Sequence, residues 1–99
     1  MEVTNPKYEH QGIHVIASIF TVDKGDLKVL LVKRINEPFK NSWALTGGAL
    51  YNDEDLEAGL SREIYEKTGL KNIEVKFSKV FGKKDRSPVM RMIAITYIG

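Results

Sequence analysis

Cysteine is absent from the 99 residues of this chain. Disulfide bonds, thiolate nucleophiles and cysteine metal sites are therefore excluded from the sequence. Histidine is scarce as well: His10 and His14 form no metal-binding motif with each other, and no Ser-His-Asp arrangement is recognisable. The lack of cysteine fits a cytoplasmic protein.

Long apolar runs are also missing. The longest strongly apolar stretch, residues 13–20, is too short to cross a bilayer, so we expect no membrane-bound form. Residues 1–11 are polar and lack the apolar centre of a signal peptide, and we expect them to form an N-terminal tail. The formal net charge is +2, and Lys and Arg form no continuous run, so overall charge gives no support for nucleic-acid binding.

The chain is long enough for one small domain, and its apolar patterns predict several strands. Residues 13–22 are rich in β-branched side chains and apolar on both alternating faces, which is typical of a strand buried on both sides. The turn signal at residues 23–26 predicts a hairpin with the next strand. Gly47 and Gly48 are expected to break the third strand. The predicted strands are residues 13–22, 27–34, 43–45, 73–81 and 89–98.

One helix is predicted from residue 53 to residue 68. Asn52 is a suitable N-cap, and acidic residues follow it in the first turn, where the helix dipole favours negative charge. Gly69 stands where a C-terminal glycine cap is expected. Apolar residues recur every four positions and give the helix one apolar face: Leu56, Leu60 and Ile64. With the strands, this helix predicts a mixed α+β domain.

Two glutamates on this helix carry the predicted chemistry. Glu63 and Glu66 are three residues apart, so they project from neighbouring points on one helix face. Carboxylates held close together repel each other, and a hard divalent cation such as Mg²⁺ relieves that repulsion, because it prefers oxygen ligands. A carbonyl of Gly47 or Gly48 would add a ligand. The plainer interpretation is that both glutamates are solvated acids on a helix face.

Residues 48–70 resemble the signature box of the Nudix (MutT-like) family. The box reads G, five residues, E, seven residues and then R-E-U-x-E-E-x-G-U, where U is a bulky aliphatic residue. Eight of its nine defined positions match at the required spacing: Gly48, Glu54, Arg62, Glu63, Ile64, Glu66, Gly69 and Leu70. The resemblance implies a Nudix-like α/β/α sandwich with a mixed sheet. Because that fold continues with a further strand and helix, we expect residues 12–99 to be the N-terminal part of a larger domain.

The ninth position departs from the box, since Lys67 stands where the family has a further Glu. The family binds its catalytic metals with these acids. The resemblance therefore implies that Glu63 and Glu66 are metal ligands or the base, with the Gly47 carbonyl as a further ligand. The residues that would orient them are Arg62 and Glu54. A protonated lysine cannot bind a metal. It also changes the charge of the acidic trio, which is formed by positions 63, 66 and 67, from −3 in the family to −1 here. We expect Mg²⁺ binding to be weakened or lost.

A closer resemblance lies upstream of the box. Residues 27–34 and 37–45, followed by two glycines, are similar to the ADP-ribose-type Nudix branch, although the usual proline before the glycines is Thr46 here. That branch includes Nudix-related transcriptional regulators of NAD metabolism. They sense ADP-ribose with the Nudix domain and bind DNA through a C-terminal winged helix, a pattern that these 99 residues do not contain.

Four residues are predicted to bind the substrate: Arg34, Trp43, Gly48 and Lys67. Three of them, Arg34, Trp43 and Lys67, also have a plainer interpretation. Arg34 is suited to clamping a phosphate, or it simply ends a strand in solvent. Trp43 is either a stacking platform or a core or lid residue. Lys67 contacts phosphate, or it only serves the negative end of the helix dipole.

The sequence thus predicts a Nudix-type hydrolase that cleaves a nucleoside diphosphate linked to another group, with an ADP-ribose-like compound as substrate. Water would attack phosphorus while Mg²⁺ neutralises the diphosphate, and Glu63 or Glu66 would help to activate the water. The alternative, from a different class, is a non-catalytic ADP-ribose-sensing domain of a transcriptional regulator, which Lys67 favours. We also expect a homodimer, because one helix leaves apolar strands uncovered on the other side of the sheet.

Overall fold

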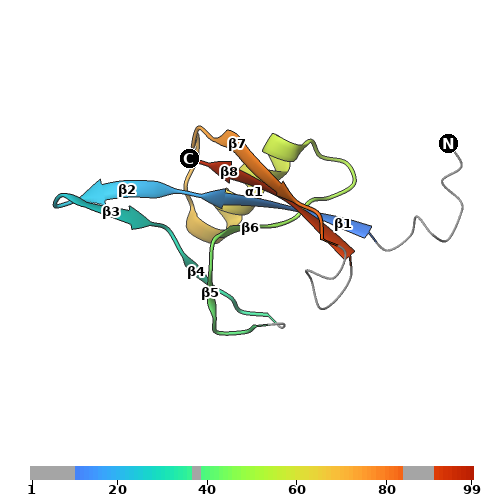
Figure 1. The fold of residues 1–99 in the computed structure, drawn as a ribbon, viewed down its shortest axis with the longest axis horizontal. Coiled ribbons are helices and arrows are strands. Elements are labelled where there is room, and N and C mark those ends of the chain that lie inside the picture. The colour runs from blue at the N-terminus through green and yellow to red at the C-terminus, as the bar shows by residue number, and fades with distance from the viewer. Residues whose placement is uncertain (1–10, 37–38, 84–90) are drawn as a thin grey trace, which may run out of the picture.

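The computed structural model describes residues 11–36, 39–83 and 91–99. Figure 1 shows a curved sheet with a helix packed against it and two hairpin arms. In chain order, the elements of these residues are β1 (Gln11–Ser18), β2 (Phe20–Asp23), β3 (Asp26–Val29), β4 (Val32–Lys33), β5 (Trp43–Ala44), β6 (Thr46–Ala49), α1 (Leu56–Thr68), β7 (Lys76–Phe81) and β8 (Arg91–Ile98). The predicted α+β class is confirmed. Among the described residues, no helix has the length and apolar content needed to cross a membrane.

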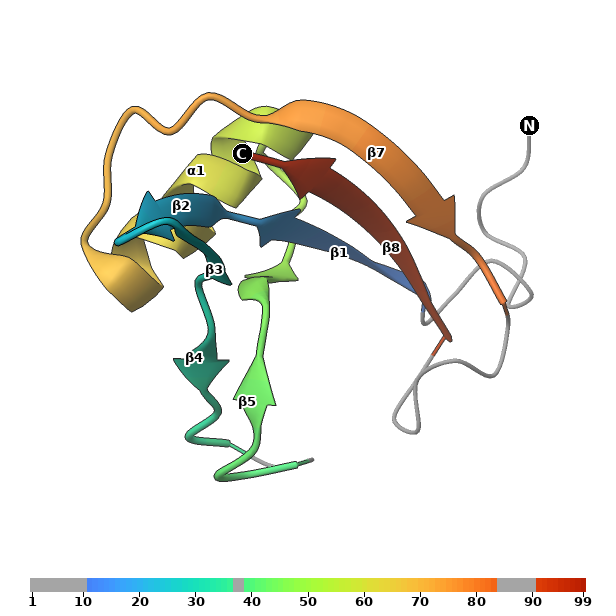
Figure 2. The same cartoon turned by 60° about the vertical axis from the view of Figure 1, so that its left-hand side comes forward.

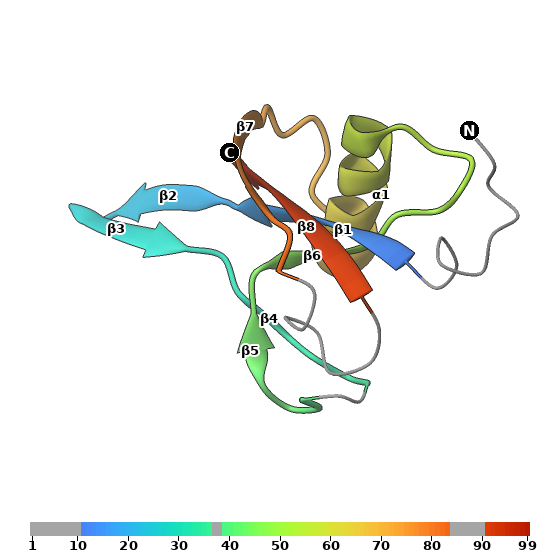
Figure 3. The ribbon, with the colours of Figure 1, turned by 45° about the vertical axis from the view of Figure 1, so that its right-hand side comes forward.

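The main sheet has four strands in the order β6-β1-β8-β7. β1 runs parallel to β8, whereas β6 is antiparallel to β1 and β7 is antiparallel to β8. The sheet is therefore mixed, as predicted. α1 packs on one face of it, against β1 and β6, and Figures 2 and 3 show the helix on a single side of the curved sheet.

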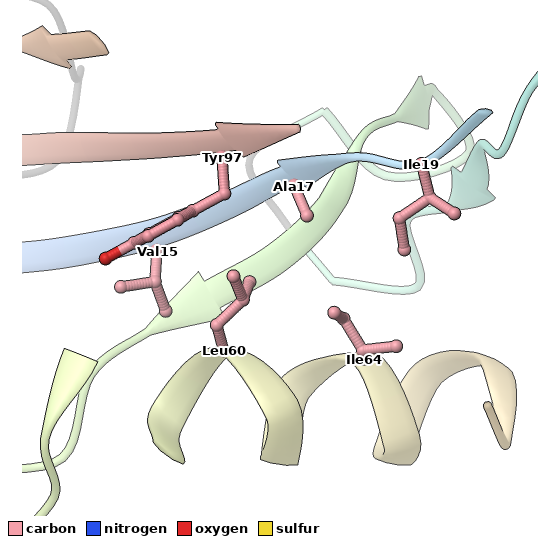
Figure 4. Packing of buried hydrophobic residues seen from close by; sticks show 6 residues of the cluster. All are labelled: Val15, Ala17, Ile19, Leu60, Ile64 and Tyr97. Carbon is pink, nitrogen blue, oxygen red and sulfur yellow. The ribbon is translucent and has the colours of Figure 1, made fainter. Parts of the chain in front are cut away.

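The core lies between α1 and the side of the sheet that faces it. The parallel pairing of β1 with β8 puts Ala17 beside Tyr97 on that side. Figure 4 shows the side chains of the sheet and those of Leu60 and Ile64 pointing toward one another. The predicted apolar face of the helix is thus confirmed. The buried residues of this core are Val15, Ala17, Ile19, Leu60, Ile64 and Tyr97.

The strand predicted at residues 13–22 is wrong in one respect, because it divides at Ile19 into β1 and β2. The carbonyl of Ser18 accepts a hydrogen bond from Gly99 N at 2.9 Å, whereas that of Ile19 accepts one from Leu30 N at 2.8 Å. The chain therefore changes its pairing partner here. β2 is exposed along its length, so the predicted burial on both sides does not hold for this part. The predicted hairpin is confirmed, since β2 pairs with β3.

The second predicted strand, residues 27–34, also divides. β3 ends at Val29, and β4 begins at Val32 and pairs with β5 in a separate two-stranded arm. Figure 2 shows β4 and β5 side by side, extending away from the main sheet. The predicted short strand near Trp43 is confirmed as β5.

The glycine pair lies inside a strand and does not break one as predicted. Gly47 and Gly48 belong to β6, where Gly48 pairs with Val15 and Gly47 with Ile16. A Cβ atom on Gly47 would overlap the carbonyl oxygen of Val15. Glycine is therefore needed here for close backbone approach, although glycine is depleted in strands on average.

α1 begins at Leu56, three residues later than predicted, with Asp55 as its N-cap in place of Asn52. The acidic residue of its first turn is Glu57. Its predicted end is confirmed: Gly69 adopts the left-handed conformation with φ 77°, and its N–H binds the carbonyl of Tyr65. Such a φ angle strains any residue with a side chain, which explains the glycine.

β7 begins later than predicted. β7 begins at Lys76, so Ile73 and Val75 lie in the connection from α1, where both are half-buried against the core. β8 begins at Arg91, and residues 89–90 of its predicted range lie outside the described residues. Residues 1–10 of the predicted tail also lie outside them, and Gln11 begins β1.

Candidate functional site

Gly48 of β6 faces the acidic side of α1 at close range. Gly48 pairs with Val15, whose side chain points at the helix, so the α-carbon of Gly48 lies on the same side of the sheet. A Cβ atom on Gly48 would overlap the carboxylate of Glu63. The side chain of Glu63 is 10% exposed. It therefore lies beside the glycines, as predicted, but it is buried there and does not face open solvent.

Arg62 connects three glutamates of the box. Its Nη2 donates to Oε1 of Glu54 at 2.8 Å and its Nε to Oε2 of the same carboxylate at 2.9 Å. Its Nη1 donates to Oε2 of Glu66 at 3.2 Å and lies 3.4 Å from Oε2 of Glu63. A fork of fixed donors suits such multiple recognition of carboxylates. This geometry supports the predicted role of Arg62 and Glu54, which is to orient Glu63 and Glu66.

The loop before α1 completes the surroundings of Arg62. Its Nη2 also donates to the carbonyl of Ala49 at 3.0 Å, and its guanidinium lies 3.8 Å from the ring centroid of Tyr51. The amide of Tyr51 donates to Oε1 of Glu54 at 2.8 Å. The hydrogen bond from Arg62, and after it the one from Tyr51, lowers the pKa of Glu54 below its usual value. The same bond to Glu54 raises the pKa of Arg62.

Sequence reasoning missed two residues of this arrangement, Tyr51 and Gly59. A Cβ atom on Gly59 would overlap Leu50 and lie 2.9 Å from Oε1 of Glu54, so this helix position must stay small. Both fall in the unspecified positions of the box. A glycine inside a helix is unfavourable by propensity, and that cost was the only signal in the sequence that pointed to Gly59.

Lys67 occupies the side of Glu63 that is turned away from Arg62. Its ammonium donates a hydrogen bond to the carbonyl oxygen of Gly47 and lies 3.7 Å from Oε1 of Glu63. Its side chain is 40% exposed. The Gly47 carbonyl and Glu63 are two of the ligands that the box predicts for a metal. In this structure both contact the lysine.

The arrangement does not fit a resident divalent cation. Glu66, the third predicted ligand, is held by Arg62. Within residues 11–36, 39–83 and 91–99, no three His, Cys, Asp or Glu side chains are grouped so that they could hold a metal. The predicted oxygen donors are therefore turned toward the chain's own cations.

A pocket of about 380 Å³ opens beside Lys67. It lies between the C-terminal half of α1, the β4–β5 arm and β6, and its lining includes the predicted residue Arg34 together with Lys33, Gly47, Glu66 and Lys67. The structure thus brings Arg34 and Lys67 together although they are far apart in sequence. Glu63 and Gly48 are not in the lining. A second hollow, of about 270 Å³, lies at Tyr65, Lys71 and Ile73 and contains none of the box carboxylates.

Trp43 does not line the pocket. It lies on β5 opposite Lys33, and it is 66% exposed. The interpretation of Trp43 as a core residue is therefore wrong, and its exposed ring is on the arm that borders the pocket.

The chain is similar in sequence to known proteins. The chain is 36% identical over 86 residues to an ADP-ribose pyrophosphatase of Methanocaldococcus jannaschii, an alignment that covers 87% of this chain and 51% of that protein. It is 37% identical over 82 residues to the ADPR responsive transcriptional repressor NtrR of Acinetobacter baylyi, which covers 81% of this chain and 33% of the repressor. The chain spans about half, or less, of the curated relatives it matches.

The fold has solved counterparts. The NUDIX domain of Shewanella oneidensis NrtR, crystallised with ADP ribose, superposes with a TM-score of 0.86 at 33% identity, covering 96% of this chain and 64% of that one. The sequence model of the NUDIX domain matches residues 12–98. With the three box glutamates gathered around Arg62, this match shows that the chain belongs to the Nudix family.

Proposed function

We propose that this domain binds an ADP-ribose-like nucleoside diphosphate in the pocket beside Lys67, as part of a Nudix hydrolase. The observation that carries the proposal is the charge of the pocket lining. It contains three cations, Lys33, Arg34 and Lys67, and one carboxylate, Glu66, so the net charge is 3 − 1 = +2. A diphosphate is the complementary anion, and Arg and Lys are the side chains that bind phosphate oxygens best.

The pocket gives the two predicted acids different roles in this proposal. Glu66 lines the pocket and its side chain is 53% exposed, so it is the carboxylate that would activate a water molecule. Glu63 is buried, and with Arg62 and Glu54 it would position Glu66 and the glycine strand. Gly48 would serve by leaving room for Glu63. Trp43 remains a predicted contact for the rest of the ligand.

The proposed reaction is hydrolysis of a diphosphate. Water adds to one phosphorus, the bond from that phosphorus to the bridging oxygen breaks, and the proton of the water leaves through Glu66. The products from ADP-ribose would be AMP and ribose 5-phosphate. Magnesium is the metal that the family box predicts. Lys67 contacts two of the predicted ligands, so the reaction as proposed relies on Glu66 and the cations of the pocket.

A second candidate function is ADP-ribose sensing without cleavage. The contact of Lys67 with the Gly47 carbonyl and with Glu63 favours it, since this contact takes up ligands that a metal-dependent hydrolase needs. The resemblance to a transcriptional repressor supports it too. In that role, DNA would be bound through a domain that is not part of these 99 residues.

One experiment separates the two functions. ADP-ribose is titrated into the protein by calorimetry, and the mixture is then separated by chromatography. A hydrolase releases AMP and ribose 5-phosphate, whereas a sensor gives binding heat and leaves ADP-ribose intact. Arg34→Gln should weaken binding, and Lys28→Gln, a change on the β2–β3 hairpin outside the pocket, should not. Neither heat nor product would contradict both functions.

Two further proposals concern the state of the protein. The homodimer expected from the sequence would bury the apolar face of the β2–β3 hairpin, which is formed by Phe20, Val22, Leu27 and Val29 and is exposed in the single chain. The absence of cysteine supports a cytoplasmic location.

A further inference from the structure

Lys67 places a positive charge between two oxygen donors from different elements. The carbonyl acceptor belongs to Gly47 on β6, and the carboxylate 3.7 Å away belongs to Glu63 on α1. Both donors therefore converge on a cationic group that the chain itself supplies.

Glu63 is held from its other side as well. Its Oε2 lies 3.4 Å from Nη1 of Arg62, and the α-carbon of Gly48 packs against its carboxylate. A buried carboxylate is costly unless positive charge compensates it. Arg62 and Lys67 together supply that compensation. The positive charge that faces the Glu63 carboxylate thus comes from the chain's own side chains.

A divalent cation and this ammonium cannot share the same oxygens. Mg²⁺ requires oxygen ligands at about 2.0–2.1 Å, so it would reach Gly47 and Glu63 only after Lys67 had moved away. The displaced lysine would still be attached one helix turn from Glu63, and its charge would repel the ion. Lys67 therefore opposes metal binding whether it keeps its place or leaves it.

The same ammonium is accessible to a ligand. Lys67 lines the pocket that also contains Arg34, and its side chain is 40% exposed. An ammonium group has three donors, so after Gly47 and Glu63 it can serve one more acceptor, which the pocket can deliver. A phosphate oxygen is well suited to this place, because lysine binds phosphate as a point charge.

We propose that Lys67 is a built-in cation that replaces the divalent metal of the box and binds the diphosphate directly, so that ligand binding needs no metal. This inference rests on the proposed binding of an ADP-ribose-like compound in the pocket. It adds that one residue of α1, Lys67, makes the site bind a diphosphate that carries no metal ion.

The proposal has a ligand half, that Lys67 binds the diphosphate without a metal, and a metal half, that Lys67 opposes metal binding. The ligand half is tested by titrating ADP-ribose into the full chain in EDTA and again in magnesium chloride. The wild type should bind equally well under both conditions. Lys67→Gln, which keeps a polar side chain but is one atom shorter and carries no charge, should weaken binding in EDTA by about tenfold or more, the usual worth of a charge-assisted hydrogen bond. Binding of ADP-ribose to the wild type only with magnesium would overturn the inference while leaving the proposed function intact.

The metal half is tested without any nucleotide, by following Mn²⁺ binding through electron paramagnetic resonance. Lys67→Glu should raise the affinity for Mn²⁺ by a factor of about ten or more over the wild type, because it restores the acidic trio. Lys71→Glu makes the same change of charge outside the pocket and should behave like the wild type.

Equal Mn²⁺ affinity of the wild type and Lys67→Glu would overturn the metal half. Absence of ADP-ribose binding under both conditions would overturn the proposed function and, with it, the ligand half. The Mn²⁺ titration decides the metal half in either case, and Lys67→Gln provides a second variant should Lys67→Glu fail to fold.

Discussion

The α-carbon of Gly48 on β6 and the carboxylate of Glu63 on α1 pack so closely that a single added methyl group would overlap Oε1 of the glutamate. The carboxylate thus occupies the space that a side chain at position 48 would need. It lies between Arg62 and Lys67. Any side chain at position 48 would therefore have to displace the carboxylate of Glu63.

Gly48→Ala should destabilise the domain. The alanine methyl forces the buried Glu63 out of its place, and overpacking of this kind costs about 1–3 kcal/mol of unfolding free energy. Thermal or urea unfolding followed by circular dichroism measures the loss. Gly82→Ala is the matched control, since a Cβ atom there meets nothing within 4 Å. An unchanged stability of Gly48→Ala would mean that Glu63 is free to move.

The pairing of Glu54 with Arg62 should make stability depend on pH in the acidic range. The pKa of Glu54 is lowered below its ordinary value of 4.5 in the folded protein. Its contribution to stability is therefore fully present above pH 4.5 and is lost as the pH falls through the lower, folded pKa.

Glu54→Gln tests that dependence. At pH 7 the variant should melt at a lower temperature than the wild type. The gap should narrow as the pH falls from 4.5, where Glu54 takes up a proton in the unfolded chain, through the lower pKa of the folded protein. Glu74→Gln, at an exposed position after α1, should keep the wild-type pH profile. A gap for Glu54→Gln that stays constant down to pH 3 would contradict the assigned role of the Arg62 contact.

Thr46 offers a stabilising substitution. Its side chain is fully buried, and its hydroxyl has no hydrogen-bond partner in the part of the chain that the structure describes. An unsatisfied buried hydroxyl costs about 1–3 kcal/mol. Thr46→Val keeps the shape and removes the hydroxyl, so it should raise the unfolding free energy by about 1 kcal/mol, or the melting temperature by roughly 4–8 °C.

Thr96→Val is the opposite case, because the Thr96 hydroxyl donates to the carbonyl of Lys79 at 2.9 Å and accepts from its amide at 3.1 Å. The same chemical change should here lower the unfolding free energy by about 1 kcal/mol. If Thr46→Val lowered stability as well, its hydroxyl would have to be hydrogen-bonded in solution.

The proposed dimer can be tested at the β2–β3 hairpin. Val22 pairs with Leu27 on its apolar face, and Thr21 pairs with Lys28 on the other. Val22→Glu should shift the protein from dimer to monomer in analytical ultracentrifugation at micromolar concentration, because a charge would be buried in the interface. Thr21→Glu, which adds the same charge opposite Lys28, should leave the dimer intact. A wild-type chain that sediments as a monomer would exclude this assembly.

Local periodicity made part of this fold predictable. The apolar face of α1 and its glycine end follow from the spacing of residues within a single helix. The start of α1 was misplaced because Asn52 and Asp55 are both good caps. The choice between them depends on Glu54. Its side chain binds the Tyr51 amide and Arg62, and this residue stays in the loop before the helix.

The site was predictable as far as the box reaches. The box spacing identified Arg62, Glu63 and Glu66, and the structure places Lys67 close to Glu63, as its position one helix turn away implied. The contact of Lys67 with the Gly47 carbonyl was not predictable, because it requires β6 to pair with β1. The pocket depends in the same way on where the β4–β5 arm lies, which is a long-range property of the fold.

The central claim is that a diphosphate ligand binds in the pocket between α1, β6 and the β4–β5 arm. It is tested most directly by adding ADP-ribose, in the presence of EDTA, to ¹⁵N-labelled protein and following the amide resonances by NMR. The account predicts that the largest shifts fall on residues that line the pocket, which are residues 32–36, Ala44, Leu45, Gly47, Glu66 and Lys67. Shifts confined to Ser61, Tyr65 and residues 70–73, which line the other hollow, would contradict it.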